Sequence, residues 1–202
     1  MAYPPRLVFP GAIYHVTARG DNRELTFLDD EDHRKYLALI ARSKKQLQFK
    51  LHAYALMPNH VHLIVEPSES ATISRIMQGI TIAYTKWFNK RHTRVGHVFQ
   101  GRFHSRLIEQ DAYLLVASRY VHRNPVRAKL VQHPAEYPWS SYRAYMGKTE
   151  NDELVDTKLV EELITSNSLI PNMGYRDFVE QAFRSEQRLF QSISDIETAF
   201  DI

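Results

Sequence analysis

The chain has 202 residues, of which 44% are hydrophobic, and this is enough to bury an ordinary core in one principal domain with an appendage. The sequence has no cysteine, which excludes a disulfide framework and a thiolate metal site and favours an intracellular protein. It also has no apolar run near the roughly 20 residues that a bilayer-spanning helix needs. We therefore expect no membrane partner and a cytoplasmic location.

The net charge of +3 is unevenly distributed along the chain. Residues 1–146 contain 21 Lys and Arg against 11 Asp and Glu, a balance of +10, whereas residues 147–202 contain 5 against 12, a balance of −7. Ten of the basic residues fall within residues 86–129, where they are interleaved with aromatic residues. Cations that neutralise phosphates and rings that stack on bases indicate a nucleic-acid partner, although a solvated basic face gives the same pattern.

The N-terminal part of the sequence predicts a strand, a helix and a second strand. Residues 12–18 are rich in β-branched and aromatic side chains, which is typical of a strand. Asp29 or Asp30 is a suitable N-cap for a helix whose apolar residues recur at helical spacing up to about Gln48. Residues 51–56 then predict the next strand.

A third strand begins at His60, and a second helix opens at Ser70 or Thr72. Residues 103–108 supply a fourth strand. This order is β-α-β-β-α-β, which predicts an α+β fold of the ferredoxin-like kind, a sandwich with an antiparallel sheet. Such a sheet carries its two helices on one face and leaves the other face for a further element.

A further helix is predicted over residues 112–123, where Asp111 is a suitable N-cap and Pro125 should end the helix. We expect it on the open face of the sheet, in a domain that spans residues 1–147. The acidic extension, residues 148–202, predicts two short helices over residues 157–165 and 175–190. The extension either packs against the basic surface and limits access to it, or is a peripheral helical element.

The most informative motif is His60-Val61-His62, which follows the turn formers Pro58 and Asn59 and so lies in a hairpin. Successive side chains of a strand point to opposite faces, so the two histidines share one face while Val61 lies on the other. One face would then be core and the other a seat for a divalent metal. Two hydrogen-bonded strand histidines without a metal are the alternative.

Two residues of the helix after the fourth strand could complete such a site. Tyr120 and Asn124 lie four residues apart, so they project from the same side of the helix. Asn124 offers an amide oxygen to a hard cation, and Tyr120 offers a phenol that can act as a nucleophile. Alternatively, Tyr120 belongs to the core and Asn124 is a local cap before a proline.

Four ordered segments carry a resemblance to a known family: residues 57–62 (MPNHVH), 99–103 (FQGRF), 120–127 (YVHRNPVR) and 137–142 (YPWSSY). Together they resemble the REP-associated tyrosine transposases, which belong to the HUH single-tyrosine superfamily. The resemblance runs from about Tyr14 to Gly147, and the acidic extension lies outside it. It implies the fold described above, with the tyrosine helix crossing near a metal.

The resemblance also implies roles for particular residues. His60 and His62 would be the HUH metal ligands, Asn124 a third, amide-bearing ligand, and Tyr120 the nucleophile. Mg²⁺ or Mn²⁺ is the ion usual in the family, although imidazole ligands alone do not exclude Zn²⁺.

The implied partner is single-stranded DNA with a palindromic hairpin of the REP type, and the implied location is the nucleoid. The implied reaction is cleavage and strand transfer through a 5′-phosphotyrosine. We expect five arginines to contact DNA phosphates: Arg19, Arg23, Arg102, Arg123 and Arg127.

Two alternatives to a transposase remain at this stage. One is a hairpin-binding regulatory protein whose chemistry has lapsed, and the other is a replication or plasmid-mobilisation nuclease of the same superfamily. We favour a monomer, because the link from Ile108 to Asp111 is short enough for the tyrosine helix to pack on its own sheet, although a dimer is possible for this superfamily.

Overall fold

The computed structural model describes residues 11–109, 111–147, 153–166 and 173–181. Two short 3-10 helices, Asp21–Arg23 and Pro134–Glu136, accompany the main elements. Those elements are β1 (Ile13–Arg19), α1 (Asp30–Leu47), β2 (Lys50–Met57), β3 (His60–Glu66), α2 (Ile73–Arg91), β4 (His104–Ile108), α3 (Asp111–Arg127), α4 (Tyr142–Tyr145), α5 (Lys158–Ser166) and α6 (Tyr175–Glu180). No helix within the described ranges is both long and apolar enough to cross a membrane.

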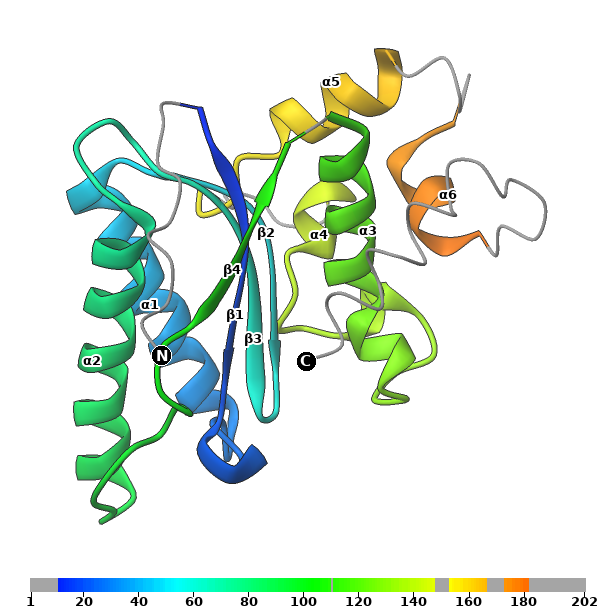
Figure 1. Ribbon diagram of the computed structural model, residues 1–202. Helices are drawn as coiled ribbons and strands as arrows, with labels where there is room; N and C mark the ends of the chain where they lie inside the picture. Colours follow the sequence, from blue (N-terminus) through cyan, green and yellow to red (C-terminus); the bar gives the residue numbers. More distant parts are fainter. Residues whose placement is uncertain (1–10, 110, 148–152, 167–172, 182–202) are drawn as a thin grey trace.

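The four strands form one antiparallel sheet in the order β2-β3-β1-β4. The helices α1 and α2 cover one face of the sheet and α3 covers the other (Figure 1). This is the β-α-β-β-α-β arrangement of a ferredoxin-like sandwich with an additional helix on the opposite face. The predicted fold class is therefore confirmed.

Side-chain caps fix the starts of the first two helices. The Asp29 carboxylate accepts the backbone N–H groups of Glu31 and Asp32 at the start of α1. The Thr72 hydroxyl accepts the N–H of Arg75 at the start of α2. Each cap satisfies N–H groups that have no partner inside the helix, so of the paired alternatives in the sequence, Asp29 and Thr72 are the residues used.

The end of α3 differs from the prediction. The helix continues through Pro125 to Arg127, so the expectation that Pro125 ends it is wrong. A proline removes only its own N–H from the helix, and the bias against a helical residue before it is a tendency that packing can override. The last turn is closed by bonds from the N–H of Ala128 to Asn124 O and from the N–H of Leu130 to Pro125 O.

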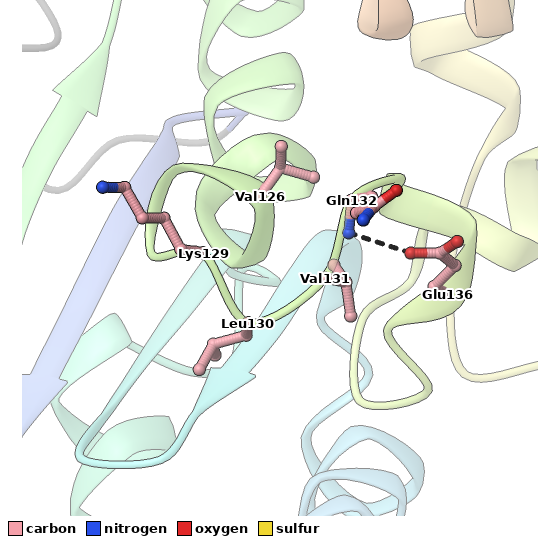
Figure 2. Close-up of a pocket in the computed structure, with 6 residues that line it drawn as sticks. All are labelled: Val126, Lys129, Leu130, Val131, Gln132 and Glu136. Carbon is pink, nitrogen blue, oxygen red and sulfur yellow. Dashed lines mark hydrogen bonds between the residues drawn. The ribbon is translucent and has the colours of Figure 1, made fainter.

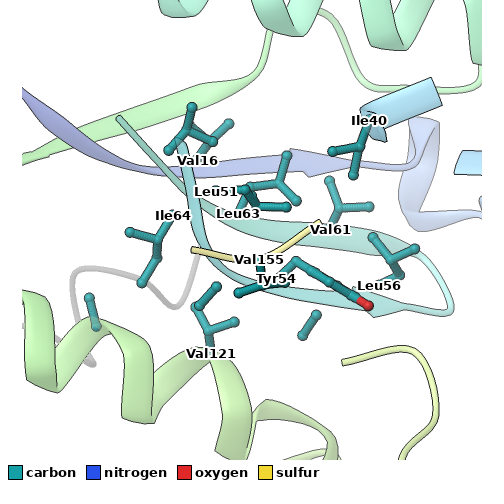
Figure 3. Packing of buried hydrophobic residues seen from close by; sticks show 14 of the residues in the cluster. Val16, Ile40, Leu51, Tyr54, Leu56, Val61, Leu63, Ile64, Val121 and Val155 are labelled. Carbon is teal, nitrogen blue, oxygen red and sulfur yellow. The ribbon is translucent and has the colours of Figure 1, made fainter. Parts of the chain in front are cut away.

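Both faces of the central strand β3 are buried. Leu63 packs on the side of Ile40 from α1, and Val121 of α3 lies on the other side of the sheet (Figure 3). His62 is only 2% exposed. The expectation of one core face and one open chemical face is therefore too simple, because α3 seals much of the second face.

The C-terminal extension packs on α3 through arginine side chains. Arg119 donates from Nε to Phe178 O (2.8 Å) and from Nη2 to Gln181 O (2.9 Å). These carbonyls end α6, where the helix dipole is negative and favours a cation. Screening of DNA by the extension stays a prediction, as does the division of the chain at Gly147.

The first helix expected in the extension is confirmed as α5, within one residue at each end. The second is shorter than expected. It ends at Glu180, because Gln181 has extended backbone angles (φ −65°, ψ 139°). The rest of the expected helix, residues 182–190, lies outside the described residues.

Candidate active site

The two histidines of the motif lie at the start of β3 and face α3. In the antiparallel pairing with β1, His60 lies opposite Arg19 and His62 lies opposite Thr17. Residues opposite one another in such a pair project from the same face of the sheet. The centroids of the two imidazole rings are 4.8 Å apart, so the strand holds them side by side.

Each imidazole is oriented by a hydrogen bond at Nδ1. The Nδ1 atom of His60 lies 2.6 Å from Asn59 Oδ1, and an amide oxygen accepts only, so this nitrogen carries the proton. The Nδ1 atom of His62 lies 3.0 Å from His15 Nε2 and 3.4 Å from Thr17 Oγ1. The Nε2 atom of each ring is therefore the nitrogen left for a metal.

Both histidines are neutral at ordinary pH. Burial, together with the charge of Arg19, lowers the pKa of His60 to about 4. Burial also holds the pKa of His62 well below its usual value. Neutral imidazole is the form that binds metals, so the two rings are prepared for a cation without losing a proton.

The remaining ligands would have to come from groups other than ionised side chains. In the part of the chain that the structure describes, no three His, Cys, Asp or Glu residues are grouped to hold a metal ion. Asn124 is buried and lies one turn beyond Tyr120 on α3, so the two side chains project from the same side of the helix. An amide oxygen suits a hard divalent cation, so two imidazoles and Asn124 fit the metal that the motif predicts.

Tyr120 lies against the histidine pair. Its ring centroid is 5.5 Å from that of His62 and 6.0 Å from that of His15, with both rings perpendicular to it. The guanidinium carbon of Arg127 lies 5.0 Å from the centroid of the same tyrosine ring. Because only two residues separate β4 from α3, the helix reaches the sheet of its own chain. The motif histidines and Tyr120 therefore come together within one chain.

The predicted DNA-binding arginines fall into two groups. Arg19, at the end of β1, and Arg127 adjoin the site, whereas Arg23 is exposed at the end of the 3-10 helix Asp21–Arg23 and Arg102 is exposed in the loop before β4. The Arg102 loop is tied to β1 by a bond from the N–H of Gln100 to Arg19 O (2.8 Å). Arg123 differs, because its Nη1 atom donates to Val179 O of α6 (2.8 Å). A phosphate contact by Arg123 would compete with docking of α6.

A pocket of about 740 Å³ lies just beyond α3, lined by residues from Val126 to Glu136 (Figure 2). The Glu136 carboxylate accepts the backbone N–H of Gln132 there (2.9 Å). His60, His62, Tyr120 and Asn124 are not part of this lining. The candidate site is thus defined by convergent side chains and not by this pocket.

Two functionally placed histidines were not predicted from the sequence. His15 contacts His62, and its own pKa is lowered to about 3 by burial and the charge of Arg106. His122, on α3, is fully buried between Ser141 Oγ and Tyr175 OH, each 2.7 Å from a ring nitrogen. The two-residue alternation of β1 was the only signal for His15.

Comparison with known proteins agrees with this geometry. The family model for IS200-like transposases matches residues 9–124, which is more than half of the chain. A Haemophilus influenzae protein that carries the name REP-associated tyrosine transposase is 25% identical over 146 residues, which are 65% of this chain and 80% of that protein.

Among solved structures, a REP-associated tyrosine transposase bound to a REP hairpin superposes with a TM-score of 0.64. It is 21% identical and covers 78% of this chain and 93% of its own, a likeness that concerns the fold. The family model extends from the first strand through the histidine motif to Tyr120 and Asn124. The chain therefore belongs to the family of IS200-like transposases, and the resemblance that its motifs carried is confirmed.

Proposed function

We propose that this transposase is a metal-dependent endonuclease and strand transferase for single-stranded DNA, and that it acts at REP-like palindromic hairpins through a 5′-phosphotyrosine. The observation that carries the proposal is the position of Tyr120, whose ring centroid lies 5.5 Å from that of His62. Phosphoryl transfer to tyrosine needs a nucleophile held close to the group that binds the phosphate, and Tyr120 lies against one of the proposed metal ligands.

His60 and His62, through their Nε2 atoms, and Asn124, through its amide oxygen, would hold Mg²⁺ or Mn²⁺. When bound there, such an ion would supply Lewis-acid charge at the scissile phosphate. Asn59 and His15 would orient the two imidazole rings through their hydrogen bonds to Nδ1. The protein thus contributes a rigid strand that fixes the phosphate relative to α3.

Tyr120 would attack the phosphorus. A bond forms between the phenolic oxygen and phosphorus, and the bond from phosphorus to the 3′-oxygen breaks. The phenolic proton passes to solvent, and the departing 3′-oxygen takes a proton from solvent to become a free 3′-OH. The Arg127 guanidinium, 5.0 Å from the ring centroid, stabilises the negative charge that develops on the phenol. The phosphotyrosine keeps the phosphodiester energy, so a second 3′-OH can reverse the step on another strand without ATP.

A hairpin substrate is supported by the charge near the site and by the relative bound to a REP hairpin. Arg19, Arg23, Arg102 and Arg127 would contact backbone phosphates around an unpaired strand. Arg123 would do so only when α6 is displaced, because it donates to α6 carbonyls. The protein would act as a monomer, since one chain contributes both histidines and Tyr120.

A palindromic oligonucleotide labelled at its 3′ end tests the proposal, because the downstream fragment keeps the label and the phosphotyrosine link. With Mn²⁺ we expect a protein-DNA adduct that survives denaturing electrophoresis, and with EDTA we expect none. A second candidate is a hairpin-binding regulator without chemistry, favoured by the burial of Tyr120, which is only 4% exposed. Binding without an adduct at any metal concentration would support that second candidate and contradict the first.

Replacing Arg102 with alanine should weaken hairpin binding and reduce the salt dependence of the affinity by about one unit of slope, because one phosphate contact is lost. The measurement is the dissociation constant across a salt series. Arg42→Ala is the matched control, because Arg42 is exposed on α1, which covers the other face of the sheet. An Arg102→Ala slope equal to that of Arg42→Ala would remove Arg102 from the DNA contacts.

A further inference from the structure

His15 lies on β1, the strand between β3 and β4, and is 2% exposed. Its ring lies nearly parallel to that of His62, with centroids 5.1 Å apart and planes 9° from parallel. Its Nε2 atom lies 3.0 Å from His62 Nδ1. Its ring also makes a T-shaped contact with that of Tyr120, with centroids 6.0 Å apart. His15 therefore contacts both the expected metal ligand and the expected nucleophile, from the side of the sheet.

We propose that His15 is a positioning residue for the metal site, which accepts the Nδ1–H of His62 and thereby keeps His62 Nε2 unprotonated for the cation. The inference rests on the proposed function. A neutral imidazole has one donor and one acceptor nitrogen, so a proton fixed at Nδ1 leaves the lone pair at Nε2. Metal-binding histidines usually donate their other ring nitrogen in this way.

The contacts of the other motif histidine, His60, support this role for His15. His60 meets the same requirement with a different group, because its Nδ1 bonds to Asn59 Oδ1. For His62 the other neighbour at Nδ1 is the Thr17 hydroxyl, which is farther away at 3.4 Å. His15 supplies the shorter contact, and its nearly parallel ring suits a hydrogen bond made in the plane of the His62 imidazole.

The register of the sheet explains how His15 reaches His62. Thr17 lies directly opposite His62, and His15 is two residues away on the same face of β1. A diagonal neighbour at this spacing is within reach only of a long side chain. The geometry places an imidazole where alanine or serine would leave His62 without its nearer acceptor.

The tautomer of His62 provides a test that does not depend on activity. In the metal-free full chain labelled with ¹⁵N-histidine, we expect long-range ¹H–¹⁵N spectra to show His62 protonated at Nδ1. In His15→Phe the same resonance should shift toward the Nε2–H form. Mn²⁺ affinity, measured by titration with electron paramagnetic resonance, should fall about 10- to 100-fold, the usual effect of losing such a partner.

Two further variants separate positioning from packing. His15→Gln keeps an acceptor oxygen and should restore most of the Mn²⁺ affinity and the Nδ1–H signal. His97→Phe is the control, because His97 is an exposed histidine outside the sheet. This control should change neither the tautomer of His62 nor the Mn²⁺ affinity.

The inference is overturned if wild-type His62 is protonated at Nε2, or if His15→Phe keeps both the tautomer and the affinity. A wild-type protein that binds no Mn²⁺ would contradict the proposed function instead, and the wild-type tautomer would still decide the role of His15. The same spectrum decides the question if His15→Phe fails to fold.

Discussion

Replacing Tyr120 with phenylalanine should lower the rate of adduct formation by at least about 10³-fold, because removal of the nucleophile leaves only background chemistry. The substitution removes one oxygen and keeps the ring that packs against His62 and Arg127. Hairpin affinity should therefore stay close to that of the wild type. The measurement is the initial rate of adduct accumulation on denaturing gels, at saturating hairpin and Mn²⁺.

Tyr113→Phe is the matched control for this experiment. Tyr113 lies on the same helix, and its hydroxyl is buried without a hydrogen-bond partner, so its loss should cost nothing in rate. A Tyr120→Phe variant that forms adduct as fast as Tyr113→Phe would show that another residue attacks the phosphate. A loss of hairpin binding in Tyr120→Phe would indicate instead that the phenol holds the DNA.

Replacing His122 with leucine should lower the free energy of unfolding by about 2–4 kcal/mol, since two buried hydrogen bonds are lost and their partners remain. Burial lowers the pKa of His122 to about 3, so the ring is neutral and bridges Ser141 Oγ and Tyr175 OH with one donor and one acceptor nitrogen. The bridge joins α3 to the loop before α4 and to α6. Urea unfolding measures the loss.

His97→Leu controls for the substitution itself, because His97 is exposed, and its effect should stay within about 0.5 kcal/mol. An equal stability for the His122 and His97 variants would mean that the bridge does not hold α3. We also expect slower adduct formation in His122→Leu, since Tyr120 lies on the helix that the bridge fixes. Slower adduct formation in this variant would show that the contact with α6 helps to orient the tyrosine helix.

Much of the fold could be predicted from the sequence because local signals agreed with one another. Strand-like and helical patterns alternated clearly, and Asp29 and Thr72 marked helix starts by capping chemistry. The end of α3 could not be predicted from Pro125, because the last turn depends on packing and on bonds beyond the proline. The end of α6 also depends on distant groups, since its carbonyls meet arginines of α3.

The candidate site was only partly visible in the sequence. His60, His62, Tyr120 and Asn124 stand in short motifs, so spacing and resemblance were enough to select them. His15 acts only through the register of β1 on β3, which alternation of residue types does not determine. Arg123 could not be told from a phosphate-binding arginine, because its partner Val179 is 56 residues away.

The most direct test of the central claim is to map the covalent link itself. After incubation with Mn²⁺ and a palindromic oligonucleotide, nuclease and protease digestion followed by mass spectrometry should find a nucleotide 5′-phosphate on the peptide that contains Tyr120. The same peptide should be unmodified with EDTA or in a variant with both His60 and His62 replaced by alanine. A nucleotide on any other residue, or cleaved DNA with no modified peptide, would contradict the account.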